Sequence, residues 1–146
     1  MKPQFDSAWD HFCKMRIYVA GKFEKKELIR DIYKKLREIG HEISYDWTTH
    51  KPISPYSENQ ELAKEYSQKE IEGISNADVL ICIPGDKSIT SNIEFGAALM
   101  LVKIKGKPKI YMVGQFNDKS PWFFNPLVKR KEHIDEVLEE LKSSAH

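Results

Sequence analysis

Two glutamates in this chain of 146 residues have positions suited to chemistry. Glu70 falls near the centre of the apolar stripe of a predicted helix, where a carboxylate must be paired, hydrogen-bonded or functional. The alternative, that it lies at the helix end and points past the core, stays open on spacing alone. Glu94 lies at the beginning of the helix that follows the third predicted strand, at the carboxyl edge of the sheet. There the helix N-terminus would keep the carboxylate ionised, as a nucleophile requires.

Glu94 also has a purely structural interpretation. The segment from Ser91 to Glu94 has the S-x-x-E spacing of a capping box, in which the glutamate binds the backbone of the serine. From spacing alone this interpretation is favoured over catalysis. The preceding loop, 85–91, is polar and rich in hydroxyl groups, and loops of this kind before a helix can bind phosphate. It lacks the P-loop spacing, however, and by itself is more typical of a solvated turn.

The elements that position these residues follow from hydrophobic periodicity. Strands are predicted at 16–20, 41–45, 78–83 and 109–113. Helices are predicted at 24–39, 58–75, 92–104 and 130–142, with loops at 46–57 and 114–128. Because the strands are continuous apolar runs that alternate with helices, the fold class is α/β: a doubly wound, parallel sheet with helices on both faces. Ligands of such sheets bind beyond the carboxyl ends of the strands.

Length and composition are those of a soluble protein with a single domain. The length suits a single domain, 1–146, with 1–15 as an N-terminal extension. A net charge of +1 gives no indication of nucleic acid or membrane as a partner, and no apolar run is long enough to span a bilayer. The N-terminus lacks the features of a secretory signal. Two cysteines and scattered histidines give no metal pattern, and a cytoplasmic location is expected.

Four segments together resemble the nucleoside 2-deoxyribosyltransferase-like superfamily, which includes deoxynucleoside 5′-monophosphate N-glycosidases. They are IYVAGKF at 17–23, HEISYDWT at 41–48, EIEGISNADVLICI at 70–83 and NIEFGAAL at 92–99. The resemblance extends over about residues 16–140. It implies a flavodoxin- or Rossmann-like parallel sheet of about five strands, in agreement with the periodicity.

The resemblance also implies catalytic roles. Glu94 matches the family's nucleophile, Tyr18 matches its strand-one tyrosine, and Glu70 takes the place of an acidic residue that is usually aspartate. Ser88 matches a position that is typically Asp in transferases for free nucleosides and Ser in the monophosphate hydrolases. Because a carboxylate would repel a phosphate, Ser88 favours a 5′-monophosphate substrate.

Further residues are expected to bind the substrate, a small-molecule nucleoside or nucleotide. They are Gly21, Lys22, Phe23, Asp46, Trp47, Ser88, Ser91, Ser120 and Asn125. Trp47, Phe23 or the aromatic residues at 122–124 would hold the base. The resemblance implies a homodimer or higher homo-oligomer in which the 114–128 loop, through Ser120 or Asn125, completes a neighbour's site. No cofactor is expected.

The predicted function is therefore cleavage of an N-glycosidic bond through a glycosyl ester of Glu94, which is released to water or to another base. Two alternatives remain open at this point. One is an enzyme that cleaves the nicotinamide–ribose bond of an NAD-type substrate with a similarly placed glutamate. The other is a non-catalytic nucleotide-binding module, for which the capping interpretation of Glu94 suffices.

Overall fold

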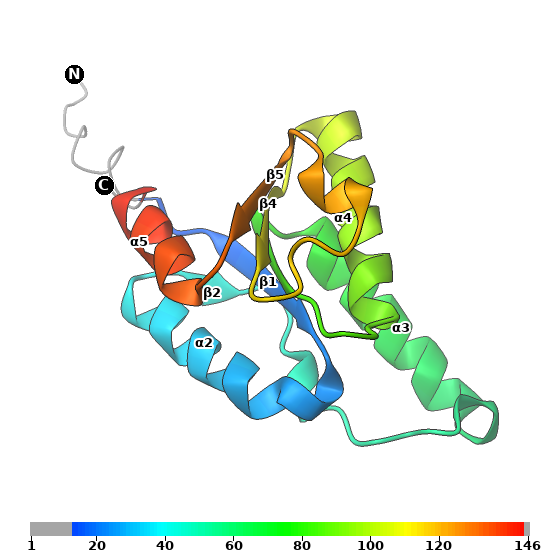
Figure 1. Ribbon diagram of the computed structural model, residues 1–146. Helices are drawn as coiled ribbons and strands as arrows, with labels where there is room; N and C mark the ends of the chain where they lie inside the picture. Colours follow the sequence, from blue (N-terminus) through cyan, green and yellow to red (C-terminus); the bar gives the residue numbers. More distant parts are fainter. Residues whose placement is uncertain (1–12, 145–146) are drawn as a thin grey trace.

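A computed structural model describes residues 13–144 of the chain. The N-terminal extension predicted at 1–15 lies outside the described residues, apart from its last three. The described part of the chain forms one parallel sheet with strand order β2-β1-β3-β4-β5 (Figure 1). The strands are β1 (Arg16–Gly21), β2 (Glu42–Ile43), β3 (Val79–Ile83), β4 (Lys109–Val113) and β5 (Val128–Lys131).

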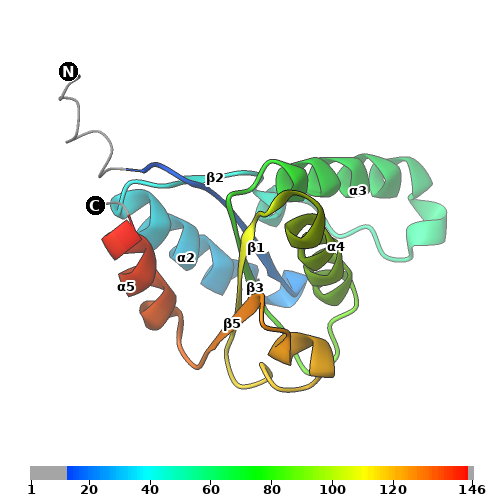
Figure 2. The ribbon, with the colours of Figure 1, turned by 90° about the horizontal axis from the view of Figure 1, so that it is seen from above.

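Long helices cover both faces of the sheet. They are α2 (Lys26–Glu38), α3 (Gln60–Ser75), α4 (Thr90–Lys105) and α5 (Ile134–Ser144). Figure 2 shows α2 and α5 on one face and α3 and α4 on the other. The predicted doubly wound α/β fold is thus confirmed.

The central strands are buried on both faces because their sequences are apolar at every position. In β1 the side chains from Ile17 to Ala20 are fully buried, and β3 from Val79 to Cys82 is nearly so. These two strands are neighbours, and Gly21 pairs with Ile83 at their carboxyl ends. The chain turns away from β1 toward β2 on one side and β3 on the other, so the crevice expected of such sheets opens at this edge.

The edges of the sheet differ from the sequence-based expectation. The strand β5 was missed, since its residues were assigned to the end of a loop and the start of the last helix, which begins at Ile134 rather than at 130. Its sequence, VKRK, lacks an apolar run because an edge strand keeps its polar side chains in water. The strand predicted at 41–45 is reduced to the two residues of β2.

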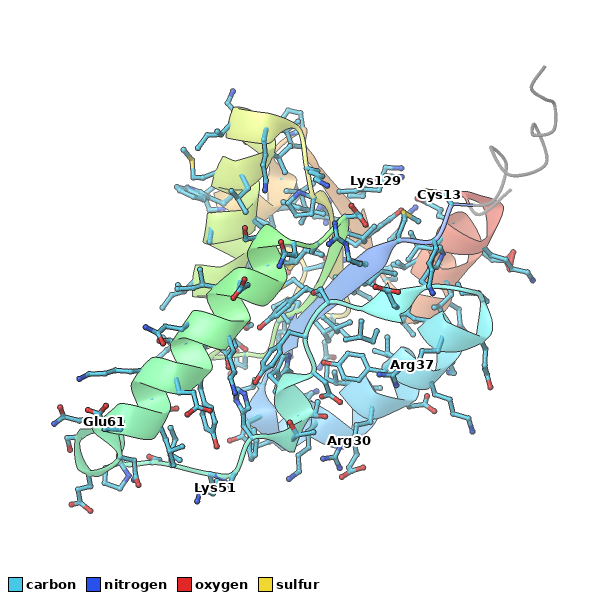
Figure 3. All side chains as sticks on the ribbon, turned by 180° about the vertical axis from the view of Figure 1, so that it is seen from behind. Cys13, Arg30, Arg37, Lys51, Glu61 and Lys129 are labelled. Atoms are coloured by element: carbon cyan, nitrogen blue, oxygen red, sulfur yellow. The ribbon has the colours of Figure 1, made fainter. Side chains whose placement is uncertain are left out.

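The turn after β2 is fixed by polar contacts to α2. Asp46 caps the short 3₁₀ helix Trp47–Thr49, since its carboxylate accepts from the backbone N–H of Thr48 at 2.9 Å. Arg30 reaches across from α2 (Figure 3) and donates to the carbonyl oxygen of Thr48 at 2.9 Å. The indole N–H of Trp47 donates to the carbonyl of Val19 at 2.6 Å, which fastens the turn to β1.

Gly73 on α3 provides a test of how closely this helix approaches the sheet. A Cβ atom at Gly73 would lie 2.6 Å from Cβ of Tyr45 and 3.2 Å from the ring of Tyr18. Although alanine is the better helix former, we expect Gly73→Ala to lower the free energy of unfolding by about 1–3 kcal/mol through overpacking. Urea denaturation measures the change. Glu72→Ala, at the exposed neighbouring position, is the control, and a stabilised Gly73→Ala variant would contradict the close packing.

Candidate active site

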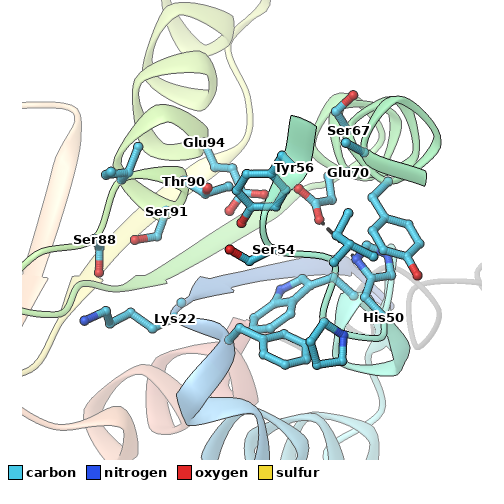
Figure 4. A pocket seen from close by; sticks show the side chains of 18 of the residues that line it. Lys22, His50, Ser54, Tyr56, Ser67, Glu70, Ser88, Thr90, Ser91 and Glu94 are labelled. Carbon is cyan, nitrogen blue, oxygen red and sulfur yellow. Dashed lines mark ion pairs between the residues drawn. The ribbon is translucent and has the colours of Figure 1, made fainter. Parts of the chain in front are cut away.

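A cavity of about 620 Å³ lies beyond the carboxyl ends of β1 and β3. This is the size of a pocket for a small-molecule ligand. Its walls come from the turn after β1, the segment 47–56, the inner face of α3 and the N-terminus of α4. Residues on these walls include Gly21, Lys22, Phe23, Trp47, His50, Tyr56, Tyr66, Glu70, Ser88, Ser91 and Glu94. Figure 4 shows the carboxyl groups of Glu70 and Glu94 pointing into the same space.

Glu94 is held by a tyrosine from the centre of the sheet. The hydroxyl of Tyr18 donates to Oε2 of Glu94 at 2.5 Å. Glu94 is only 7% exposed and Tyr18 is fully buried. A hydrogen bond of this length fixes the orientation of the carboxyl group at the wall of the cavity.

The predicted capping box is not formed. The helix α4 begins at Thr90, its N-cap is Ile89, and no side chain caps it. Ser91 therefore lies within the first turn rather than at the cap, and its buried hydroxyl has no hydrogen-bond partner. The structural interpretation of Glu94, which spacing alone favoured, is wrong because the helix starts one residue before Ser91 and Tyr18 binds the glutamate.

Glu70 and Glu94 line the same cavity, and each affects the pKa of the other. Glu70 extends from α3 into the cavity, with 20% of its side chain exposed, so it does not point past the core. Burial raises the pKa of Glu94 to about 8, with the proximity of Glu70 adding to the shift, whereas the hydroxyl of Tyr18 opposes it. Burial also raises the pKa of Glu70. Burial therefore favours a proton on one of the two carboxyl groups, whereas the hydroxyl of Tyr18 favours the ionised form of Glu94. The expectation that the helix N-terminus keeps Glu94 ionised stays a prediction.

A histidine that the sequence analysis missed lies on the far side of Glu70. Nδ1 of His50 is 3.4 Å from Oε2 of Glu70, and Nε2 is 2.6 Å from the hydroxyl of Tyr45. The imidazole stacks on the ring of Tyr66 at a centroid distance of 3.6 Å. The residue was missed because it falls in an irregular, proline-containing segment without periodicity.

The opposite end of the cavity is polar and basic. Ser88, Ser91 and Lys22 gather there, next to the N-terminus of α4 (Figure 4). A Cβ atom at Gly85 would lie 2.5 Å from Cδ of Lys22 and 3.0 Å from Oγ of Ser88, so the glycine lets the lysine pack against the loop. The hydroxyl oxygen of Ser88 accepts from the backbone N–H of Gly85 at 2.8 Å, which leaves its proton for a ligand.

The structure brings most of the predicted substrate-binding residues to the cavity and separates others from it. Gly21, Phe23 and Trp47 line the cavity. The carboxylate of Asp46 is instead used to cap the turn beside it. Ser120 and Asn125 flank the short 3₁₀ helix Pro121–Phe124, and neither they nor the aromatic residues 122–124 line this cavity.

The described residues, 13–144, contain no cluster of three His, Cys, Asp or Glu side chains that could hold a metal ion. Within the same part of the chain, no helix is both long and apolar enough to cross a membrane.

Comparison with known proteins supports the fold. No protein-family model and no curated protein matches the chain. Among solved structures, the chain is similar to the CMP N-glycosidase BcmB of Clostridium botulinum, with a TM-score of 0.57 and 21% identity over 86% of this chain and 96% of that one. At 21% identity this likeness confirms the α/β fold.

The raised pKa of Glu94 predicts a pH-dependent cost to stability. Because the carboxyl group has a pKa of about 8 when folded and an ordinary value near 4.5 when unfolded, deprotonation favours the unfolded chain. Stability is therefore full below about pH 4.5 and is lost as the pH rises toward 8. We expect Glu94→Gln to raise the melting temperature at pH 7.5 by about 3–8 °C.

Thermal unfolding between pH 5 and 8 measures this effect. The gain from Glu94→Gln should shrink as the pH falls toward 5, because the carboxyl group of the unfolded wild-type chain, with a pKa near 4.5, then begins to regain its proton. A gain that does not vary with pH, or a loss at every pH, would exclude a buried, protonated Glu94.

Proposed function

We propose that this protein is an N-glycosidase that cleaves the bond between base and sugar in a nucleoside 5′-monophosphate. The proposal rests on one observation above all: two carboxyl groups, those of Glu70 and Glu94, face the same cavity, and a tyrosine hydroxyl donates to one of them. Such a pair supplies the nucleophile and the acid that glycoside cleavage through a covalent intermediate needs. The fold likeness to a CMP N-glycosidase agrees with this chemistry.

In the first step, ionised Glu94 attacks C1′ through an oxocarbenium-like transition state. The C1′–N bond breaks, its electron pair leaves with the base, and Glu70 gives its proton to the base. A glycosyl ester of Glu94 forms, and Glu70 becomes a carboxylate. Because the pKa of Glu94 is raised to about 8 in the free protein, this step requires the proton of the pair to move to Glu70 before the attack. The hydroxyl of Tyr18 favours that distribution by stabilising ionised Glu94.

In the second step, Glu70 acts as the base. It accepts a proton from water as the oxygen of the water attacks C1′, and the ester bond breaks to restore ionised Glu94 and protonated Glu70. Another base can replace water as the acceptor, which would make the same site a transferase. One group thus serves as acid and then as base, as in retaining glycosidases.

The polar end of the cavity supports a phosphorylated substrate. The ammonium group of Lys22, the hydroxyls of Ser88 and Ser91 and the first N–H groups of α4 all suit an anion. The buried hydroxyl of Ser91 has no partner in the free protein, so a phosphate oxygen would provide one. The base would then lie at the other end, among Phe23, Trp47 and Tyr56.

The proposed activity is tested by chromatographic detection of free base from nucleosides, their 5′-monophosphates and NAD, with and without an acceptor base. We expect base release from monophosphates. Glu94→Ala should lower turnover by at least about 10³-fold, since it removes the nucleophile. Ser88→Asp should raise KM for the monophosphate by about tenfold or more through charge repulsion.

Other outcomes of this assay would reject the proposal. Release of nicotinamide from NAD alone would indicate the NAD-type enzyme, and new nucleoside formed only with an acceptor would indicate a transferase. Nucleotide binding without turnover, unchanged in Glu94→Gln, would indicate a binding module. Full turnover by Glu94→Ala would exclude the assigned nucleophile.

We further propose that the protein forms a homodimer through α4. Apolar side chains on the outer face of this helix are exposed: Ile89, Ile93, Met100 and Ile104. Their spacing of 4, 7 and 4 residues places them in one stripe, and exposed Trp122 and Phe124 extend the apolar surface of the molecule. A second copy of the same stripe would cover it across a twofold axis. The predicted contribution of Ser120 or Asn125 to a neighbour's site stays a prediction of this dimer.

Light scattering tests this association. We expect the mass of a dimer for the wild type and of a monomer for Met100→Glu, because the substitution buries a charge at the interface. Lys34→Glu, an acidic substitution at an exposed position of α2 on the other face of the sheet, should remain dimeric. A monomeric wild type, or a dimer that Met100→Glu leaves intact, would exclude this interface.

A further inference from the structure

We propose that His50 is a positioning residue for Glu70: its Nδ1–H holds Oε2 of Glu70 so that the other carboxyl oxygen faces the leaving base. The catalytic role of His50 rests on the proposed function. The contact between its imidazole and the carboxyl group of Glu70 does not depend on turnover.

The orientation of His50 is fixed from three sides. Its ring stacks on Tyr66 with an interplanar angle of 7°. Its Nε2 is hydrogen-bonded to the hydroxyl of Tyr45, and its Nδ1 faces Glu70 (Figure 4, dashed line). The side chain is only 9% exposed, so water does not compete freely for either nitrogen. The imidazole therefore cannot rotate freely, and its two nitrogens keep Tyr45 and Glu70 as their partners.

The partners decide which nitrogen of His50 carries the proton. An ionised carboxylate only accepts hydrogen bonds, so Nδ1 must carry the proton when Glu70 is ionised. The hydroxyl of Tyr45 then donates to Nε2, and it can do so because a tyrosine hydroxyl both donates and accepts. The Nδ1–Oε2 distance of 3.4 Å is long for a hydrogen bond, as is common before a substrate closes a site.

The surroundings of His50 favour the neutral form of its imidazole, which can still donate one hydrogen bond. Burial lowers the pKa of His50, and the ammonium group of Lys69 lowers it further, whereas Asp46 and Glu65 oppose the shift. These charges and Glu70 come from α3 and from the turn after β2, the two segments packed around the ring. At neutral pH the imidazole therefore donates one hydrogen bond to Glu70 without adding a fixed positive charge that would hold Glu70 ionised.

This arrangement assigns different tasks to the two oxygens of Glu70. With Oε2 held by His50, the proton resides on the other oxygen, which is free to face the sugar and the base. After the proton has moved to the base, the N–H of His50 stabilises the new carboxylate for its task as the base in the second step. His50 acts in both steps through Glu70 and exchanges no proton with the substrate.

Carbon-13 NMR of the glutamate carboxyl groups in the substrate-free protein tests the contact directly. Spectra of Glu70→Gln and Glu94→Gln assign the two signals. Because a hydrogen bond to the ionised form lowers the pKa of a carboxyl group, His50→Phe should raise the apparent pKa of Glu70 by about one unit. His50→Asn, whose amide N–H can replace Nδ1–H, should restore most of the wild-type value, and Tyr45→Phe should give an intermediate one.

Kinetics test the catalytic consequence. We expect His50→Phe to lower kcat by about tenfold with KM changed by less than about twofold, and to move the alkaline limb of the pH profile of kcat upward, since the shared proton is lost at higher pH. His50→Asn should recover part of kcat. A structural role alone would leave this limb in place.

The two measurements separate the possible failures. An unchanged titration of Glu70 in folded His50→Phe would overturn the inference, whatever the kinetics show. Equal shifts in His50→Phe and His50→Asn would overturn it as well, because burial rather than the N–H would be the cause. A shift that only Asn reverses would uphold the contact, and absence of turnover in the wild type would then count against the proposed function and not against the contact.

Discussion

Two carboxyl groups face one cavity in which burial raises the pKa of both, and the other features of the site follow from this constraint. Glu94 comes from α4, Glu70 from α3 and Tyr18 from β1, so the fold must hold three elements that are distant in sequence around one point. The continuous apolar cores of β1 and β3 provide the rigid support. The same constraint favours a proton on one member of the pair, and the proposed mechanism gives this proton to the leaving base.

The two ends of the cavity differ in their polar groups. Lys22 and hydroxyl groups lie beside the N-terminus of α4, whereas aromatic side chains, His50 and the exposed Lys51 lie on the side of Glu70. A lysine close to Glu70 would favour its ionised form and so weaken it as an acid. Lys22 can attract a phosphate from the opposite end, where it lies beside Ser88, without being a direct partner of Glu70.

The sequence contained enough information for the centre of the fold and less for its edges. The runs at 16–20 and 78–83 predicted buried strands because a short run that is apolar at nearly every position is typical of a strand covered on both faces. The strand β5 could not be found in this way, because its sequence is basic and its strand conformation depends on pairing with β4 in the folded chain. Glu94 was ambiguous for a similar reason: S-x-x-E specifies a capping box only if Ser91 is the N-cap and the helix begins at Asn92, and boundaries are the least certain part of a sequence-based prediction.

The identity of residue 70 connects the missed histidine to the chemistry. The resemblance leads one to expect aspartate, and glutamate adds a methylene and a rotatable bond, so its carboxyl group reaches farther but is less fixed by its own backbone. A longer acidic side chain needs a contact from a neighbouring residue to keep one carboxyl oxygen directed at the substrate. His50 lies where such support is needed, and Tyr45 and Tyr66 immobilise it in turn. The departure at position 70 and the stacked histidine are therefore best understood together: the orientation that a shorter side chain would derive from its helix is supplied here by a neighbouring loop.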